Sequence, residues 1–266
     1  MSDWRLLIDR PRDGLENMAI DEAILISCND GFQGSTFRLY EWSSAVLSLG
    51  CFQKADNIIN CCSHAGIPFV RRITGGRAVL HLDEITYSIV CHEEEPLFNE
   101  GISGAYRIIN RCLFEALAAA GVKAQMHPDK ARGYSTNRIS CFHSASRYEI
   151  IANGKKLAGS AQRRFKKAFL QHGSILFGID EELVSRLFGK GAVSRMTWLR
   201  LYSDIKKDEF KAVLAEKIRE GLNIRFIPGR MSDKEVRLKE ILMAAKYADD
   251  MWNLHGIDKS HLYRAS

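Results

Sequence analysis

The chain has 266 residues, 46% of them hydrophobic, which is enough to bury one sizeable core and predicts a single main domain. Its net charge of +6, without a long basic run, favours acidic partners of some kind, while no motif supports binding to nucleic acid. The seven cysteines include no C-x-x-C pair, and neither a signal peptide nor an apolar run near 18 residues is present, so we expect reduced thiols in a cytoplasmic protein with no membrane segment.

The first elements follow from alternation and from helical spacing. Residues 4–8 alternate as a strand does, and Asn17 is a credible N-cap for the helix that follows. Asp21 and Glu22 would then sit in the first turn, where the helix dipole favours them. Two more strands are predicted at residues 37–40 and 45–49.

A glycine-containing stretch follows and organises the rest of the chain. Phe69 and Val70 lead in as a strand, Gly75 and Gly76 free the backbone to approach a ligand, and residues 78–80 resume an extended run. The pattern predicts a strand, a glycine turn and a strand that together form a loop facing a ligand. The alternative is an ordinary hairpin turn between two buried strands.

The middle of the chain predicts a strand, a long helix and a polar loop. Residues 84–91 are rich in β-branched and aromatic side chains, and residues 102–120 form an amphipathic helix stopped by Gly121. His92 lacks the second histidine that a zinc motif of the H-E-x-x-H type needs, so we expect no metal. Residues 127–140 read as a loop that delivers Cys141.

A hairpin is predicted next, because Asn153-Gly154 is a strong two-residue turn signal between apolar runs. It places Lys156 near the start of a strand, where a side chain is aimed reproducibly. The remaining elements are a strand at 169–177, a helix at 181–188, and helices at 208–221 and 232–249 flanking a strand at 223–227.

Cys141 and Lys156 together suggest nucleophilic acyl transfer. A free thiol titrates near pH 8.5, and a neighbouring ammonium lowers that value to roughly 3.5–7.5, so Lys156 could hold the thiolate at neutral pH. The same lysine could then accept or donate protons. The alternative is that Cys141 is one of seven cysteines that only pack.

Two motifs resemble those of the lipoate-protein ligase and octanoyltransferase family, which is related in fold to biotin-protein ligases. They are Arg71-Arg72-Ile73-Thr74-Gly75-Gly76-Arg77-Ala78-Val79-Leu80-His81 and Gly154-Lys155-Lys156-Leu157-Ala158-Gly159-Ser160-Ala161-Gln162. Within the family the chain is most similar to the cysteine-dependent octanoyltransferases of the LipM type, because of Ser140-Cys141-Phe142. The resemblance covers nearly the whole chain.

The resemblance implies the fold and the domain limits. It implies an α+β fold of the biotin/lipoate protein ligase type, with mixed, mainly antiparallel sheets flanked by helices. We therefore expect a catalytic domain over residues 1–253 and a C-terminal tail over residues 254–266.

The implied reaction has two halves. Cys141 takes an octanoyl group from acyl carrier protein, and a lysine of an apo lipoyl domain then attacks the thioester. Examples of such acceptors are glycine cleavage H protein and the E2 domains of 2-oxoacid dehydrogenases. No ATP or other cofactor is needed, because a thioester is already activated.

The resemblance also implies which residues bind substrate. The glycine loop and the second motif would face the acyl chain, and the full set is Arg72, Gly75, Gly76, Arg77, His81, Gly159, Ser160 and Ala161. His81 and His172 could orient the loops or could be buried, hydrogen-bonded histidines. Arg71 and Arg72 could meet an acidic partner or pair internally with a carboxylate. Arg77 replaces a glycine that ligases commonly have, which favours the transferase branch.

Three alternatives remain. The chain could be an ATP-dependent lipoate-protein ligase in which Lys156 binds the adenylate and Cys141 is incidental. It could be an amidotransferase that moves octanoyl between lipoyl domains, also through a cysteine. It could instead be a binder of lipoyl domains without catalysis, although such a binder would not need both Cys141 and Lys156.

Overall fold

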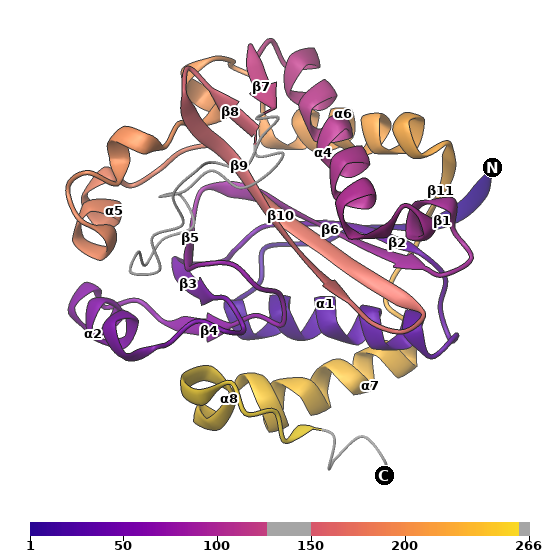
Figure 1. Cartoon of the computed structure of the whole chain (residues 1–266), viewed down its shortest axis with the longest axis horizontal. Helices are drawn as coiled ribbons and strands as arrows, with labels where there is room; N and C mark the ends of the chain where they lie inside the picture. Colours follow the sequence, from indigo (N-terminus) through magenta and orange to yellow (C-terminus); the bar gives the residue numbers. More distant parts are fainter. Residues whose placement is uncertain (127–149, 261–266) are drawn as a thin grey trace.

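A computed structural model describes residues 1–126 and 150–260, so Cys141 lies outside the described residues. In this part of the chain a long mixed sheet crosses the molecule (Figure 1). Its strand order is β11 (Ile224–Pro228), β1 (Ser2–Ile8), β2 (Thr36–Tyr40), β6 (Glu84–His92), β10 (Ala168–Leu176), β9 (Lys155–Arg164), β8 (Ile150–Ala152) and β7 (Ala124–Met126). Within this sheet only β1 pairs in parallel, with β2 and β11, and the other pairings are antiparallel.

Helices cover both faces of this sheet (Figure 1). Helices α1 (Gly14–Asn29) and α7 (Asp233–Leu242) pack together on one face, and α4 (Gly101–Ala119) and α6 (Lys207–Leu222) pack together on the other. Successive residues of β10 alternate between the two cores, because side chains along a strand point to opposite faces. The predicted α+β class, with mixed and mainly antiparallel sheets flanked by helices, is confirmed.

The glycine stretch belongs to a second, smaller sheet. Its order is β4 (Phe69–Arg71), β3 (Val46–Leu49) and β5 (Val79–His81), with a core of its own against α2 (Asp56–Ala65) and α5 (Glu181–Phe188). Strands β4 and β5 lie on opposite sides of β3, parallel and antiparallel to it. The intervening residues therefore span the width of a strand, and the alternative of an ordinary hairpin turn is wrong. Helix α2 was not predicted from the sequence.

The expected start of the first helix is also wrong. Its N-cap is Asp13, whose carboxylate accepts a hydrogen bond from the backbone N–H of Glu16 at 2.8 Å. Asn17, Asp21 and Glu22 lie inside the helix and are buried. In the sequence these polar residues had the pattern of an N-cap followed by a first helical turn. In the structure Asn17 and Asp21 hydrogen-bond to buried Arg38, and Glu22 accepts from buried Lys246.

The hairpin predicted at Asn153-Gly154 is confirmed. Both residues have positive φ, 49° and 71°, as the two central positions of a type I′ turn require. Strand β9 is longer than the predicted residues 156–158, since it continues through Gly159, Ser160 and Ala161 to Arg164. The hairpin therefore places Lys156 and the second motif on one continuous strand.

The remaining elements are short and connect or close the layers. They are α3 (Pro96–Asn99), the 3₁₀ turns Val193–Arg195 and Leu199–Leu201, the π-helical turn Met243–Tyr247 and α8 (Asp250–His255). Helix α8 crosses the boundary expected between residues 253 and 254. Among the described residues, none of the helices combines the length and apolar character needed to cross a bilayer.

Candidate active site

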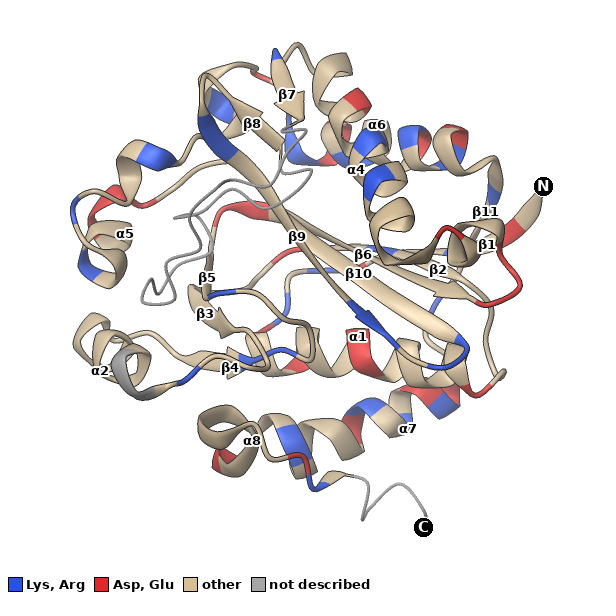
Figure 2. Cartoon of the chain, in the orientation of Figure 1, with Lys and Arg blue, Asp and Glu red and all other residues tan. Residues whose placement is uncertain are grey.

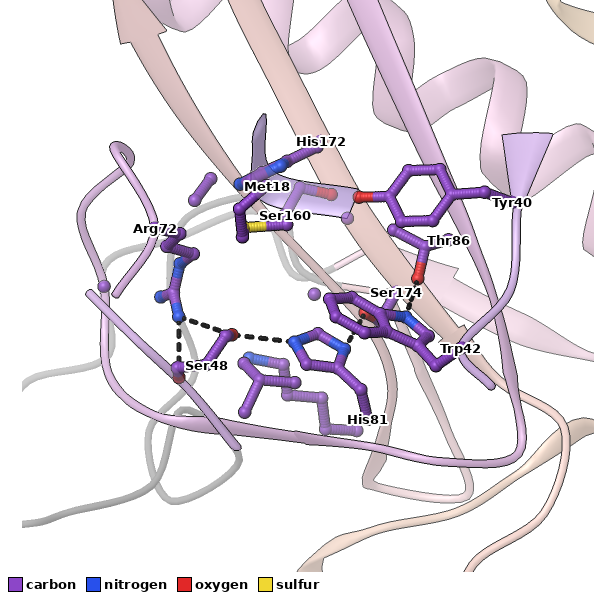
Figure 3. A pocket seen from close by; sticks show the side chains of 16 residues that line it. Met18, Tyr40, Trp42, Ser48, Arg72, His81, Thr86, Ser160, His172 and Ser174 are labelled. Atoms are coloured by element: carbon purple, nitrogen blue, oxygen red, sulfur yellow. Dashed lines mark hydrogen bonds between the residues drawn. The ribbon is translucent and has the colours of Figure 1, made fainter. Parts of the chain in front are cut away.

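A cavity lies between the glycine loop and strands β9 and β10 (Figure 3). It holds about 630 Å³ of space between atoms, part of it continuous with solvent. Apolar and polar side chains share the lining, which consists of Met18, Tyr40, Trp42, Ser48, Arg72, Gly76, Val79, His81, Thr86, Lys156, Gly159, Ser160, Ala161, His172, Gly173 and Ser174.

One wall is built from paired strands. Gly159, Ser160 and Ala161 of β9 stand opposite residues 172–174 of β10 in the antiparallel ladder. A Cβ at Gly173 would lie 2.6 Å from both the Gly159 carbonyl oxygen and the Ser160 hydroxyl, so only glycine fits there. The Ser160 hydroxyl also lies 2.7 Å from that of Tyr87, which fixes its direction.

Lys156 is part of this wall and is only 6% exposed. Its backbone carbonyl accepts a hydrogen bond from the N–H of Thr197 at 3.0 Å, so the start of β9 is held from both sides. The end of its side chain passes over Gly159, because a Cβ at Gly159 would lie 2.9 Å from Cε and 3.2 Å from Nζ. The absence of a side chain at Gly159 therefore lets the Lys156 ammonium reach the cavity.

The opposite wall is the glycine loop, and Arg72 holds it together. The guanidinium donates to the carbonyl oxygens of Gly75 and Arg77, each at 2.8 Å. It also donates to the carbonyl and hydroxyl oxygens of Ser48 at 3.0 Å and to the Thr74 hydroxyl at 3.2 Å. A buried, planar cation thus satisfies loop carbonyls that no sheet pairs.

Two glycines let this loop lie against β3. Gly76 has φ of 94°, a conformation that L side chains rarely adopt. A Cβ at Gly50 would lie 1.9 Å from the Gly76 carbonyl oxygen, so position 50 must also lack a side chain. By contrast, nothing lies within 4 Å of a Cβ built at Gly75. Gly50 was not singled out in the sequence, because the contact that requires it joins distant segments.

A carboxylate, a histidine and a hydroxyl form a chain at one end of the cavity, and Figure 3 shows its Ser48–His81 link. His81 Nδ1 lies 2.7 Å from Glu84 Oε1, and His81 Nε2 lies 2.7 Å from the Ser48 hydroxyl. Burial alone would raise the pKa of Glu84, but His81 and hydrogen bonds from Thr86 and Ser174 outweigh it, so the pKa is lowered. Glu84 is therefore a buried carboxylate that fixes the ring of His81.

A second chain of the same kind anchors the glycine loop to α1. His172 Nδ1 lies 3.0 Å from Asp21 Oδ2, and Nε2 lies 2.7 Å from the Thr74 hydroxyl. Burial lowers the pKa of His172, and the nearby charge of Arg72 lowers it further, while Asp21 offsets only part of this. The ring is consequently neutral at neutral pH. His172 thus combines the alternatives raised for it, being buried, hydrogen-bonded and in contact with the loop. His81 is a buried histidine whose hydrogen bonds reach Ser48, Glu84 and Ser174.

Asp21 is itself held by a buried cation. Arg38 Nη1 donates to Asp21 Oδ1 at 2.7 Å, and the Tyr40 hydroxyl donates to Oδ2 at 2.9 Å. Burial would raise the pKa of Asp21, but Arg38 and His172 outweigh it and the pKa is lowered. The carboxylate is therefore charged and orients the His172 ring toward Thr74.

The surface role considered for Arg71 and Arg72 is wrong. Arg71 is 1% and Arg72 4% exposed, so neither guanidinium is available to a docking partner. Arg71 instead donates to the carbonyl oxygens of Gly50 and Gln53 and, through its Nη2, to that of Leu254 at 3.0 Å. It fastens the end of α8 to the base of the glycine loop.

The residues expected to bind substrate fall into two sets. The cavity lining includes Arg72, Gly76, His81 and the strand residues Gly159, Ser160 and Ala161. Gly75 and Arg77 flank Gly76 and present their carbonyl groups to Arg72. Trp42, whose ring stacks on His81 with centroids 3.9 Å apart, was not among the residues expected to bind substrate. Neither were Ser48 and Thr74, because a lone hydroxyl carries no signal in sequence.

Comparisons with known proteins point to one family. The model of the lipoyl protein ligase A/B catalytic domain family matches residues 13–219. The octanoyltransferase LipM of Brevibacillus brevis is 36% identical, over 96% of this chain and 99% of its own length. Those of Kyrpidia tusciae and Geobacillus kaustophilus are 37% and 38% identical, over 95% and 94% of this chain and 99% and 97% of their own lengths.

Two solved structures share the fold over nearly all of the chain. A putative lipoate protein ligase from T. acidophilum with bound lipoic acid is 27% identical, with a TM-score of 0.80, and covers 96% of this chain and 100% of its own. A lipoate-protein ligase A bound with ATP is 25% identical, with a TM-score of 0.83, and covers 97% and 100%.

Proposed function

The chain belongs to the lipoyl protein ligase A/B catalytic domain family, and on this premise we propose that it is an octanoyltransferase of lipoate biosynthesis. Relatives that carry this name match it over almost their entire length. The observation in the structure that carries the proposal is the buried Lys156 side chain. It belongs to the second motif and lines the cavity that lies between the two motifs. Such a cation can stabilise a thiolate or exchange protons during acyl transfer.

The acyl group passes through Cys141 in two steps. The Cys141 thiolate attacks the carbonyl carbon of an octanoyl thioester, the bond from that carbon to the donor sulfur breaks, and an acyl-enzyme thioester forms. The donor leaves as a thiolate that takes a proton from the Lys156 ammonium or from solvent. A deprotonated lysine amine of the acceptor then attacks the same carbon, the amide forms, and the Cys141 thiol is released. No ATP enters either step, because the thioester supplies the activation.

Five of the six other cysteines support this choice of nucleophile. Burial raises the pKa of Cys28 and Cys112 to about 12 and that of Cys62 to about 11. Burial also raises the pKa of Cys51 and Cys91. These five thiols are therefore protonated at neutral pH and poor nucleophiles.

We assign the donor to octanoyl acyl carrier protein and the acceptor to an apo lipoyl domain, as in glycine cleavage H protein or 2-oxoacid dehydrogenase E2 domains. The glycine loop and strand residues 159–161 would lie along the acyl chain. Because the similar lipoate-protein ligase A structure is bound with ATP, an ATP-dependent ligase is the competing function. The two functions need different substrates, because a ligase uses ATP and a free acid whereas the transferase uses an octanoyl thioester.

The test offers an apo lipoyl domain to the enzyme with each donor in turn. Octanoyl carrier protein, an octanoylated lipoyl domain, and free octanoate with ATP are compared by mass spectrometry of the acceptor. We expect transfer from the carrier protein in ATP-free, magnesium-free buffer. Strict dependence on ATP and free acid would identify a ligase, and transfer only from the lipoyl domain would identify an amidotransferase.

The covalent step is tested separately. Octanoyl carrier protein alone should leave an adduct of one octanoyl group on the enzyme that hydroxylamine removes. Cys141→Ser should abolish turnover, since a serine hydroxyl is not ionised by a neighbouring ammonium at neutral pH. Full activity in Cys141→Ala would rule out this cysteine as the nucleophile.

A further inference from the structure

A second hollow lies beside the active cavity, on the other side of the glycine loop. It holds about 740 Å³ of space between atoms, part of it open to solvent. Ile73 of the glycine loop is in its wall, next to the Thr74 that His172 holds. The lining is Glu22, Cys51, Phe52, Ile73, Arg163, Phe165, Lys246, Trp252, Gly256 and Asp258.

The rim of this hollow is basic and carries an exposed aromatic side chain. Phe52 is 85% exposed, and Lys54, two residues further along the chain, is also exposed. Arg163 and Phe165 of the β9–β10 hairpin line the hollow as well, Arg163 and the neighbouring Lys166 are exposed, and Figure 2 shows blue at this hairpin. An exposed phenylalanine in a hollow whose lining includes an exposed arginine suits a partner that offers an apolar side chain among carboxylates.

Both sides of the rim are rigid. Arg164 is turned away from the hollow and lies over the rings of Phe98 and Phe169, at 3.9 and 5.3 Å from their centroids, which anchors the hairpin. Arg71 fixes the turn that carries Phe52 by donating to the carbonyl oxygens on either side of it, those of Cys51 at 3.2 Å and Gln53 at 2.7 Å. A partner would therefore meet exposed side chains on a backbone that is already held in place.

The hairpin connects this rim directly to the active cavity. Ala161 lines the cavity and Arg163 lines the hollow, on the same face of β9 and roughly 7 Å apart along the strand. The glycine loop separates the two spaces. A protein seated on the rim therefore lies next to the catalytic cavity without covering it. An acyl group on a long flexible arm can cross that distance, whereas an acceptor lysine, with only its four-carbon stem, must be presented over the cavity itself.

We propose that the surface formed by Phe52, Lys54, Arg163, Phe165 and Lys166 is the docking site of the acidic acyl-donor carrier protein. The proposal rests on the proposed octanoyl transfer. Carboxylates of the carrier pair with Arg163, Lys54 and Lys166, and an apolar side chain between them covers Phe52 and enters the hollow. The net charge of +6 supports an acidic partner.

The experiment compares a protein donor with a small one. Transfer to a lipoyl domain is measured with octanoyl carrier protein and with octanoyl-N-acetylcysteamine, a thioester that lacks the protein. We expect Arg163→Glu and Phe52→Ser each to raise KM for the carrier at least about fivefold. The value of kcat should stay within about twofold, because contacts at the rim affect encounter and release of the carrier and not the chemical step. Kinetics with the small thioester should stay as in wild type. Salt should weaken carrier use in wild type more than in Arg163→Glu.

Arg111→Glu is the matched control. It makes the same change of charge at a site 73% exposed on α4, in the opposite helical layer. Unchanged KM for the carrier in both rim variants would overturn the docking site, as would an equal loss with the small thioester. A rise in KM for the lipoyl domain alone would assign the surface to the acceptor and also overturn it. Failure of wild type to use either donor would instead refute the proposed function.

Discussion

The two walls of the candidate active-site cavity are held in different ways. The strand wall, Gly159–Ala161 against residues 172–174, takes its position from a backbone ladder that continues well beyond the cavity. The glycine loop between β4 and β5 has isolated backbone hydrogen bonds, from the Arg72 N–H to the Leu49 carbonyl oxygen and from the Cys51 N–H to the Thr74 carbonyl oxygen, each at 2.9 Å. It otherwise depends on side chains, namely Arg72, the pair His172 and Thr74, and the close contact at Gly50.

Because of this difference, substitutions in the two walls should affect activity and stability differently. A ladder tolerates the loss of one side chain, because its hydrogen bonds are made by the backbone. The loop wall loses several bonds when one buried side chain is removed. We therefore expect substitutions in the strand wall to change activity at nearly constant stability, and substitutions in the loop wall to change both.

The largest effect should come from the strand wall. Lys156→Met keeps the buried aliphatic chain but removes the ammonium, so octanoyl transfer should fall by about 10²–10⁴-fold, the range for a positioned proton-transfer group. The apparent pKa of Cys141 should rise, which the pH profile of iodoacetamide labelling measures. Exposed Lys155 and Lys166 supply the control substitutions for this labelling. A labelling profile like that of wild type in Lys156→Met would exclude Lys156 as the thiolate partner.

The loop wall should respond most strongly at Arg72. Arg72→Met leaves the buried carbonyl oxygens of Ser48, Gly75 and Arg77 without this donor, so the free energy of unfolding should fall by about 3 kcal/mol. Urea denaturation measures this fall, and transfer activity should decline with it. Arg77→Met, at a half-buried position of the same loop, is the matched control and should cost less than about 1 kcal/mol. Equal losses in the two variants would contradict the role of Arg72.

Glycine substitutions sharpen the comparison further. In Gly50→Ala the new Cβ would overlap the Gly76 carbonyl oxygen, so the loop must move and the free energy of unfolding should fall by about 1–3 kcal/mol. Gly75→Ala meets no atom within 4 Å and should leave stability close to wild type. In Gly159→Ala the flexible end of Lys156 must move, so activity should fall more than stability. Thermal unfolding and transfer rates on the three variants test this order.

The smallest effect concerns pH. The pKa of His172 is lowered from 6.5 by burial, so below pH 6.5 the unfolded chain binds a proton that the folded protein does not. The free energy of unfolding should therefore fall as pH drops below 6.5, by up to about 1.4 kcal/mol per pH unit from this group. His172→Gln should flatten the slope in urea denaturation from pH 5 to 6.5. The same substitution at exposed His64 is the control, and an equal flattening there would remove His172 from this role.

The sequence by itself determined the elements whose signals are local. The Asn153-Gly154 turn, the helix at residues 181–188 and the long helix ending before Gly121 need only neighbours in sequence, and all three are present. The two motifs also indicated the family, because several glycines and cations at fixed spacing are informative without any contact. Eight of the 16 residues that line the cavity belong to those motifs.

Only the tertiary structure decided which polar residues are internal. Asn17 and Asp21 look like the start of a helix in sequence, yet both hydrogen-bond to Arg38 of β2, and that contact exists only when helix and sheet are packed. Gly50, Ser48 and Thr74 likewise acquire their roles from groups far away along the chain. For the same reason the sequence did not show that β4 and β5, the strands before and after the glycine stretch, lie on opposite sides of β3. Burial converts ordinary polar residues into supports, because a buried polar group must find a partner wherever the fold supplies one.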